Sequence, residues 1–307
     1  MGKIAFCFPG QGSLEMGMGR EFAESVPEAM RVFDLASDVT GLDLKHICFE
    51  TPVEEVVDTA IQQPALIAAS LAAFAALRAH GIEPDYVVGH SVGEFAALSA
   101  SQAYTLEETF ALVRVRGIAM AAAAQEYPGS MAAILGLEDE TVETLCRRIL
   151  GVWPANYNCP GQIVVSGQNE AVDECCDQAG VAGARRAVKL AVSGAFHSPL
   201  VAKAADALRP HVEKIPFKQP EVPFMSTVTA RLEDAGKLGT LLVDQLTAPV
   251  KFTQATKALV EEGVKTFVEV GPGNVLSGLV KRIDRSVESI SVSNLAGLAK
   301  LKEHLAV

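Results

Sequence analysis

Three short apolar segments of this chain each end at a glycine turn, and the order strand, turn, helix recurs at residues 4–13, 86–93 and 265–282. Short apolar runs closed by glycine are typical of buried strands in a parallel sheet. Residues 63–78 and 106–123 have the composition of long buried helices. The pattern predicts an α/β fold in which the functional loops follow the carboxyl ends of the strands.

Residues 130–192 follow a different order. The pattern predicts strands over residues 130–137, 152–156, 162–166 and 184–192, with helices over residues 138–150 and 169–179. The order βαββαβ is ferredoxin-like. We therefore expect a subdomain at residues 127–197, inserted into a large α/β domain formed by residues 1–126 plus 198–307. A cleft between the two would be a natural substrate site.

Charge and hydropathy exclude several kinds of partner. The formal net charge is −11, which argues against nucleic acid, because phosphate backbones are bound by basic surfaces. The longest apolar run, residues 65–77, is shorter than the roughly 20 residues that a membrane-spanning helix needs. Residues 1–8 resemble a first strand more than a signal peptide. We expect a soluble, cytoplasmic protein that binds neither nucleic acid nor membrane.

No cofactor is indicated by the sequence. Six cysteines are scattered without Cys-x-x-Cys spacing, and we interpret them as reduced thiols without a catalytic role. The turn at residues 271–273 lacks the third glycine and the following acidic residue of a dinucleotide-binding fingerprint. We therefore expect no metal, flavin or nicotinamide.

Ser91 is the strongest candidate for a catalytic residue. It is the centre of the pattern Gly89-His90-Ser91-Val92-Gly93, which follows an apolar strand and precedes a helix. A Gly-x-Ser-x-Gly turn of this kind exposes the hydroxyl at a helix N-terminus, where developing negative charge is stabilised. The pattern predicts a nucleophilic serine.

A serine nucleophile needs a base, and His197 is the best candidate among the six histidines. It lies in an irregular stretch of small residues between a predicted strand and a predicted helix, where site residues concentrate. His90 is adjacent to Ser91, but neighbouring side chains on a sharp turn point apart. A histidine that supports the turn is the simpler interpretation of His90.

Two further features allow more than one interpretation. The glycine-rich turn at residues 9–13 could offer N–H groups to an oxyanion or a phosphate, or it could be only a tight turn. Arg114 and Arg116 lie among aliphatic residues of a predicted helix. Most arginines in such places extend to solvent or to a salt bridge.

Taken in order, these segments resemble the malonyl-CoA:acyl-carrier-protein transacylase family. The segments that carry the resemblance are FPGQGS (8–13), QPA (63–65), GHSVGE (89–94), RG (116–117), NCPGQ (158–162), FHS (196–198), QLTAPV (245–250) and EVGPG (269–273). They span nearly the whole chain, and several motifs in register are more specific than any one. The resemblance implies an α/β-hydrolase-like large domain with a parallel sheet and an inserted ferredoxin-like subdomain.

The resemblance also implies a mechanism. Ser91 would form a malonyl ester, and His197 would act as general base and then as general acid. The backbone carbonyl of Gln245, in place of an acidic residue, would orient the histidine. The backbone N–H groups of Gln11 and Val92 would form the oxyanion hole.

The same resemblance implies the substrates, malonyl-CoA and an acyl carrier protein, with the coenzyme A thioester as substrate and no cofactor. Arg116 would hold the malonyl carboxylate in a bidentate fork. Phe196 would leave little room for an α-methyl branch. By analogy the remaining residues of the acyl pocket would be Met120, Asn158, Gln63 and His90.

Four hypotheses remain open at this point. The first is malonyl transfer in type II fatty-acid biosynthesis. The second keeps the chemistry but places it in polyketide synthesis or in charging a malonate decarboxylase carrier. The third is a serine esterase of the α/β-hydrolase class, which predicts an acid between serine and histidine in chain order and no role for Arg116. The fourth is a non-catalytic module that binds a carrier protein, in which Ser91→Ala would change nothing.

Overall fold

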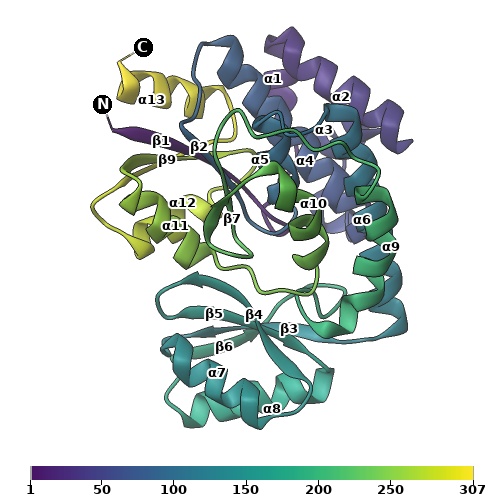
Figure 1. The fold of residues 1–307 in the computed structure, drawn as a ribbon, viewed down its shortest axis with the longest axis vertical. Helices are drawn as coiled ribbons and strands as arrows, with labels where there is room; N and C mark the ends of the chain where they lie inside the picture. The colour runs from purple at the N-terminus through teal and green to yellow at the C-terminus, as the bar shows by residue number, and fades with distance from the viewer. Residues whose placement is uncertain (1, 307) are drawn as a thin grey trace.

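The computed structural model describes residues 2–306 and contains two sheets, one of six strands and one of four (Figure 1). The large sheet has the strand order β10-β9-β1-β2-β7-β8. All neighbouring strands are parallel except β7 and β8. Its strands are β1 (Lys3–Phe8), β2 (Tyr86–Gly89), β7 (Phe224–Ser226), β8 (Arg231–Glu233), β9 (Val264–Val270) and β10 (Glu288–Val292). The predicted parallel α/β sheet is confirmed.

Helices cover both faces of this sheet (Figure 1). The helices that precede the small sheet in the chain are α1 (Arg20–Ser25), α2 (Pro27–Thr40), α3 (Leu44–Phe49), η1 (Val53–Glu55), α4 (Thr59–Ala79), α5 (Gly93–Ala100) and α6 (Leu106–Glu126). Those that follow it are η2 (Pro199–Val201), α9 (Ala202–Val212), α10 (Ala235–Asp244), α11 (Phe252–Glu261), α12 (Val275–Ile283) and α13 (Leu295–Leu305).

Strand β1 shows how the sequence divides the core. Successive side chains of a strand point to opposite faces, so Phe6 and Phe8 pack into one apolar cluster and Ala5 and Cys7 into another. The register of β1 against β2 pairs Phe8 with Gly89. The turns after β1 and β2 therefore leave the sheet at the same edge, side by side, as expected for the carboxyl ends of parallel strands.

Helix α4 begins earlier than the sequence pattern indicates. It spans Thr59–Ala79, so it is long and apolar enough to cross a membrane, in contrast to the shorter apolar run at residues 65–77. Most of it is buried inside the protein, however, and it packs against α2 and α6. It is the central helix of the core, and burial on all sides explains why it is apolar all round.

The small sheet has the antiparallel strand order β4-β5-β3-β6. Its elements are β3 (Ser130–Leu135), α7 (Asp139–Arg148), β4 (Val152–Cys159), β5 (Gln162–Gly167), α8 (Asn169–Val181) and β6 (Arg186–Lys189). The predicted βαββαβ order is confirmed. The last strand is shorter than predicted, because its pairing with β3 ends at Lys189, which lies opposite Ala132.

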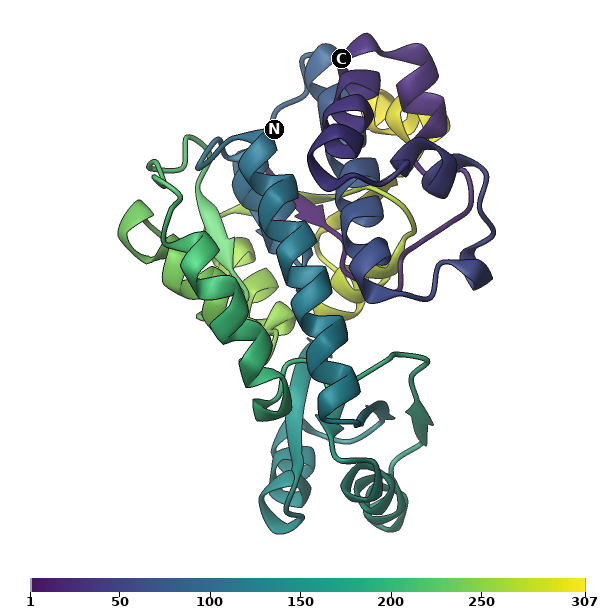
Figure 2. The same cartoon turned by 90° about the vertical axis from the view of Figure 1, so that its right-hand side faces the viewer.

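The two faces of the small sheet have different neighbours. On β3, Ala132 and Ile134 pack with α7 and α8, whereas Met131 and Ala133 belong to the apolar cluster of the large sheet. Figure 2 shows the long helix α6 running down to the small sheet with α9 beside it. The face of the small sheet opposite α7 and α8 therefore packs against the large part of the protein. The division at residues 127–197 stays a prediction.

Candidate active site

Ser91 lies on a sharp turn between β2 and α5. Its φ is 54°, in the left-handed region that non-glycine residues rarely occupy. A Cβ on Gly89 would collide with the backbone of Gly93 and Glu94, and one on Gly93 would collide with the carbonyl oxygen of Phe8. The two glycines are thus required by close backbone packing around the serine, as the Gly-x-Ser-x-Gly pattern predicts.

His197 meets Ser91 from a distant part of the chain. Its Nε2 lies 2.8 Å from Oγ of Ser91, and its φ is 57°, also left-handed. Its Nδ1 lies 2.8 Å from the backbone oxygen of Gln245 and 3.2 Å from that of Ala248. A ring that donates from Nδ1 to a carbonyl has its Nε2 free to accept the serine proton.

The electrostatic environment keeps this imidazole neutral. Burial, and then the charge of Arg116, lower the pKa of His197 to about 3. The hydrogen bond to the carbonyl of Gln245 opposes this shift in part. The partners of Nδ1 are carbonyl oxygens, so the arrangement differs from the acid–histidine–serine order of the serine esterase hypothesis.

Arg116 is buried next to the serine, with 1% of its surface exposed. Its Nη1 donates to Oε1 of Gln63 (2.6 Å), and its Nη2 donates to Oγ of Ser91 (3.3 Å) and Oε1 of Gln245 (3.0 Å). All three partners are neutral, and Nε has no hydrogen-bond partner. Burial lowers the pKa of Arg116 to about 9, and the charge of Glu94 opposes that shift. A buried cation with neutral partners is suited to receive an anion.

Close packing of α4 against α6 brings Arg116 to this place. A Cβ on Gly117 would lie 2.9 Å from Cα of Ala60, so glycine allows the two helices to approach. Pro64 inside α4 has no N–H to donate to the Ala60 carbonyl, and Nη1 of Arg114 donates to it instead at 2.9 Å. The two neighbouring arginines therefore differ: Arg114 completes a helix and Arg116 faces the serine.

Gln11 and Val92 lie on the two turns that flank the serine. Neither of their N–H groups donates to a backbone carbonyl within residues 2–306. The side chain of Gln11 is fixed by Thr59, whose Oγ1 donates to it at 2.9 Å, and by a hydrogen bond to Gln62. The turn at residues 9–13 is thus held against α4, and Gln11 lines the same cavity as Ser91.

A cavity of about 90 Å³ opens over these groups, between the large part and the small sheet. It is lined by Gln11, His90, Ser91, Met120, Met131, Asn156, Leu190, Val192, Phe196 and His197. Gln63 and Asn158, expected in the pocket, lie just behind its wall. Gln63 bonds Arg116, and Asn158 bonds Nε2 of His90 at 2.9 Å. His90 thus lines the cavity, where its bond to Asn158 holds it in place.

Four lining residues were not identified from the sequence: Met131, Asn156, Leu190 and Val192. Met131 and Asn156 belong to β3 and β4 of the small sheet. Alternation along β3 distinguishes its two faces, but the pattern does not say which face meets the large sheet. Leu190 and Val192 come after Lys189, where β6 ends, and they lie in the stretch that was predicted to be strand.

A second hollow of about 410 Å³ adjoins the cavity and shares Gln11, Leu190 and Val192 with it. Its other walls come from the turn at residues 12–14, from Val53 and Gln62, and from Val275 at the start of α12. The three shared residues place this hollow directly beside the cavity over Ser91.

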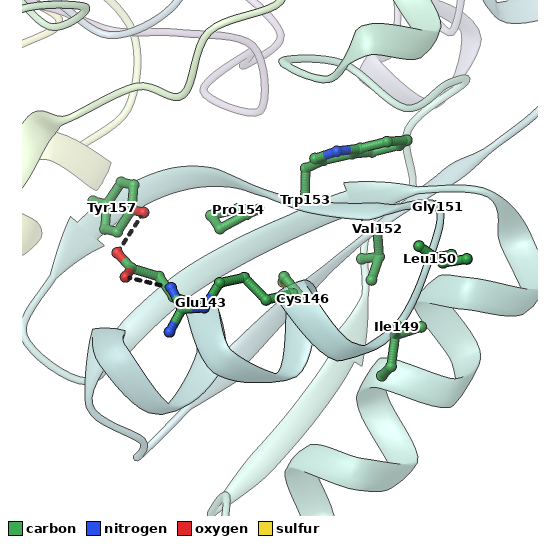
Figure 3. A pocket seen from close by; sticks show the side chains of 10 residues that line it. Glu143, Cys146, Ile149, Leu150, Gly151, Val152, Trp153, Pro154 and Tyr157 are labelled. Carbon is green, nitrogen blue, oxygen red and sulfur yellow. Dashed lines mark hydrogen bonds and ion pairs between the residues drawn. The ribbon is translucent and has the colours of Figure 1, made fainter.

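A further hollow of about 450 Å³ lies on the small sheet, away from Ser91 and His197. Figure 3 shows it between α7 and β4, where the hydroxyl of Tyr157 donates to Glu143 at 2.8 Å. The indole of Trp153 lies on one side of the strand and Val152 on the other. The serine–histidine pair lines the smaller cavity and not this hollow, so the cavity over Ser91 is the candidate active site.

Residues 2–306 contain neither a metal-binding cluster nor a disulfide. No group of three or more His, Cys, Asp or Glu side chains is arranged to hold a metal ion in that range. All six cysteines are free thiols, and five of them are buried. Burial raises the pKa of the Cys7 and Cys48 thiols, which makes them poor nucleophiles.

Comparison with known proteins agrees with this geometry. Residues 5–305 match the acyl transferase domain family. The malonyl CoA-acyl carrier protein transacylase of Bacillus subtilis (strain 168) is 42% identical over 299 residues, 96% of this chain and 94% of that protein. The protein of the same name from Staphylococcus aureus (strain MRSA252) is 36% identical over 300 residues, 96% and 97% of the two chains.

Solved structures give the same result. The acyl-carrier-protein-S-malonyltransferase from Bartonella henselae superposes with a TM-score of 0.95 at 36% identity, over 99% of this chain and 100% of that one. A malonyl-transacylase solved in complex with its type II PKS acyl-carrier protein has a TM-score of 0.94 at 37% identity, over 98% and 99%. Fold, site and matches together define an acyl transferase. Within that class, the chain belongs to the malonyl-CoA:acyl-carrier-protein transacylase family.

Proposed function

We propose that this protein transfers a malonyl group from malonyl-CoA to the phosphopantetheine thiol of an acyl carrier protein, through an ester on Ser91, in type II fatty-acid biosynthesis. One observation carries the proposal. The Oγ of Ser91 contacts both the Nε2 of His197, at 2.8 Å, and the Nη2 of Arg116, at 3.3 Å. The nucleophile therefore touches a base and a fixed cation, and an acyl group with a terminal carboxylate uses both.

In the first half-reaction, Ser91 Oγ attacks the thioester carbonyl carbon and its proton passes to Nε2 of His197. The N–H groups of Gln11 and Val92 stabilise the negative oxygen of the tetrahedral intermediate. The C–S bond then breaks, and His197 returns the proton to the departing coenzyme A thiolate. In the second half-reaction the carrier thiol attacks the Ser91 ester, with the same residues acting in reverse order.

The carboxylate of the substrate also affects the base. The charge of Arg116 lowers the pKa of His197. A malonyl carboxylate paired with Arg116 neutralises that charge, so protonation of His197 becomes easier when the correct acyl group is bound. An acetyl group lacks this effect, and leaves a buried guanidinium without an anionic partner. Both consequences favour malonyl over acetyl transfer.

Phe196 completes the proposed specificity. It is buried, and it lines the cavity of about 90 Å³ beside the base. Its ring limits the space next to the α-carbon of the acyl group, which disfavours an α-methyl branch. Of the other pocket residues expected from the sequence, Met120 and His90 line the cavity, and Gln63 and Asn158 lie behind them.

The carrier arm enters by the hollow that adjoins the cavity. The exposed arginine and lysine side chains Arg185, Arg186, Lys189, Lys281 and Arg282 are candidates for docking the acidic carrier. Lys189 is paired with Asp173, and Arg282 donates to Gln162. We further propose a cytoplasmic protein in which residues 127–197 form the inserted subdomain, with the coenzyme A thioester as substrate and no resident cofactor.

A polyketide carrier is the second candidate acceptor. The observation that favours it is the relative solved with a type II PKS acyl-carrier protein, which aligns over 98% of this chain. Discharge of the malonyl-enzyme by purified fatty-acid and polyketide carriers in parallel distinguishes the two pathways.

Intact-protein mass spectrometry tests the proposed function. After mixing with malonyl-CoA we expect one malonyl adduct, absent in Ser91→Ala and discharged by an acyl carrier protein. Acetyl-CoA and methylmalonyl-CoA, run in parallel, should give less adduct. Formation of no adduct with any of the three, together with hydrolysis of simple esters, would replace this proposal with a serine esterase.

A further inference from the structure

A neutral amide separates two buried charges next to the nucleophile. The side chain of Gln245 accepts from Nη2 of Arg116 at 3.0 Å and donates through Nε2 to Oε2 of Glu94 at 2.8 Å. Glu94 is 0% exposed, Arg116 1% and Gln245 2%. The cation and the anion therefore face each other through a single amide group, without direct contact.

The carboxylate of Glu94 is held on its other side as well. Its Oε1 accepts from the N–H of Thr227 at 2.6 Å, from the hydroxyl of Thr227 at 2.9 Å and from that of Ser226 at 3.3 Å. Glu94 lies in the first turn of α5, the helix that follows the nucleophile, where the helix dipole favours an anion. These contacts hold Glu94 as an acceptor, so its position and its role in the network are fixed.

Arg116 and Glu94 together determine which way the Gln245 amide points. Because Arg116 can only donate, the oxygen of Gln245 must face it, and the NH₂ group then faces the ionised carboxylate of Glu94. The backbone oxygen of the same glutamine holds Nδ1 of His197 at 2.8 Å. Gln245, anchored by Glu94, thus contacts both the guanidinium of Arg116 and the imidazole of His197.

We propose that Glu94 is a positioning residue that supplies the counter-charge of Arg116 at a distance, with Gln245 as a neutral spacer that keeps the guanidinium available for the substrate carboxylate. The inference rests on the proposed malonyl transfer and deepens it. A carboxylate in direct contact would form a bidentate pair with Arg116 and compete with the substrate. An amide oxygen is a weaker acceptor, which a malonyl carboxylate can displace.

The first test is Glu94→Gln. To keep its bond to the Thr227 N–H, the new amide must turn its own NH₂ toward that of Gln245. Gln245 then has to reverse and present NH₂ to Arg116. We expect the ratio of malonyl to acetyl loading to fall at least tenfold. Sulfonylation of Ser91 by phenylmethylsulfonyl fluoride, which needs only the serine and its base, should slow at least threefold because the anchor of His197 is loosened.

The matched control is the double variant Glu94→Gln with Gln245→Glu. It restores every donor–acceptor pair but moves the negative charge into direct contact with Arg116. We expect a melting temperature near that of the wild type and malonyl loading at least a hundredfold lower. Ser91 sulfonylation should be at least as fast as in the wild type, because a carboxylate on Arg116 offsets the charge that lowers the pKa of His197. A purely structural role of Glu94 predicts that the double variant recovers malonyl loading together with its stability.

Each outcome decides between these explanations. Wild-type selectivity and sulfonylation in folded Glu94→Gln would overturn the positioning role, and wild-type malonyl loading in the double variant would overturn the spacer. If Glu94→Gln does not fold, malonyl loading by the double variant still decides the proposal: a hundredfold loss supports the spacer and a wild-type rate overturns it. If the wild-type protein takes no malonyl group, the proposed function fails, while slower sulfonylation of Glu94→Gln still supports the link from Glu94 to His197.

Discussion

Replacing Arg116 by methionine tests the proposed specificity most directly. Methionine is unbranched and fills much of the same space, so it removes the guanidinium with little change in packing. The variant loses the donors to Gln63, Ser91 and Gln245 that lie at 2.6, 3.3 and 3.0 Å. It also leaves Glu94 buried without its counter-charge. Effects on the fold and on the reaction must therefore be measured separately.

The magnitude follows from the contacts that the substrate would lose. A hydrogen-bonded charged pair in a buried site contributes about 2–4 kcal/mol to transition-state binding. At 1.36 kcal/mol per tenfold, malonyl loading should fall roughly 30- to 1000-fold in kcat/KM. Acetyl loading should hold or rise, because an acetyl group has no free carboxylate to pair with Arg116 and the pKa of His197 is no longer lowered by Arg116.

The assay is stopped-flow or quenched loading with malonyl-CoA and acetyl-CoA on the same preparation, with the malonyl-to-acetyl ratio as the result. A ratio within one enzyme cancels any loss of folded protein. Arg114→Met is the matched control, since Arg114 completes helix α4 and does not contact the serine. If Arg116→Met kept the wild-type ratio, the carboxylate clamp would be wrong.

Three further predictions follow from the same geometry. With the pKa of His197 lowered to about 3, the imidazole stays unprotonated as the pH falls, so Ser91 sulfonylation should show no histidine inflection near pH 6.5. Burial raises the pKa of Glu94 to about 7, so Glu94 can titrate in the same range and Glu94→Gln is the control. An inflection near pH 6.5 that persists in Glu94→Gln would contradict the prediction. Phe196→Ala should increase methylmalonyl adduct relative to malonyl adduct in intact mass spectra, and an unchanged ratio would remove Phe196 from the specificity argument. Gly93→Ala should lower the free energy of unfolding in urea by about 2–3 kcal/mol or more, because its Cβ meets the Phe8 carbonyl, whereas Gly180→Ala, with open space around it, should not.

The fold was largely predictable because its signals are local. Apolar runs closed by glycine define β1, β2 and β9, and each glycine beside Ser91 has a steric reason in the structure. The order of strands and helices in the small sheet also follows from alternating local patterns. The end of β6 was not predictable from its own sequence, since its regular pairing stops at Lys189 although β3 continues to Ser130 and the Met131 carbonyl still accepts from the N–H of Leu190 at 2.9 Å.

The reacting groups of the site were predictable from the sequence, and the residues that hold them in place were less so. Ser91 and His197 lie 106 positions apart yet are in contact, and the family motifs supplied that link. Glu94 was visible only as part of a motif. Its partners at positions 226, 227 and 245 are more than 130 residues away, and no periodicity relates them. Long-range polar contacts of this kind follow from the tertiary fold.

Ser91 and His197 both have left-handed backbone conformations, with φ of 54° and 57°. Such conformations cost a non-glycine residue roughly 1–2 kcal/mol each. The two proposed catalytic positions therefore lower the stability of the fold that holds them. In directed evolution for heat resistance alone, glycine would relieve this strain at both positions while removing the chemistry. A screen for robust variants of this enzyme must include turnover, or the active site is among the first features at risk.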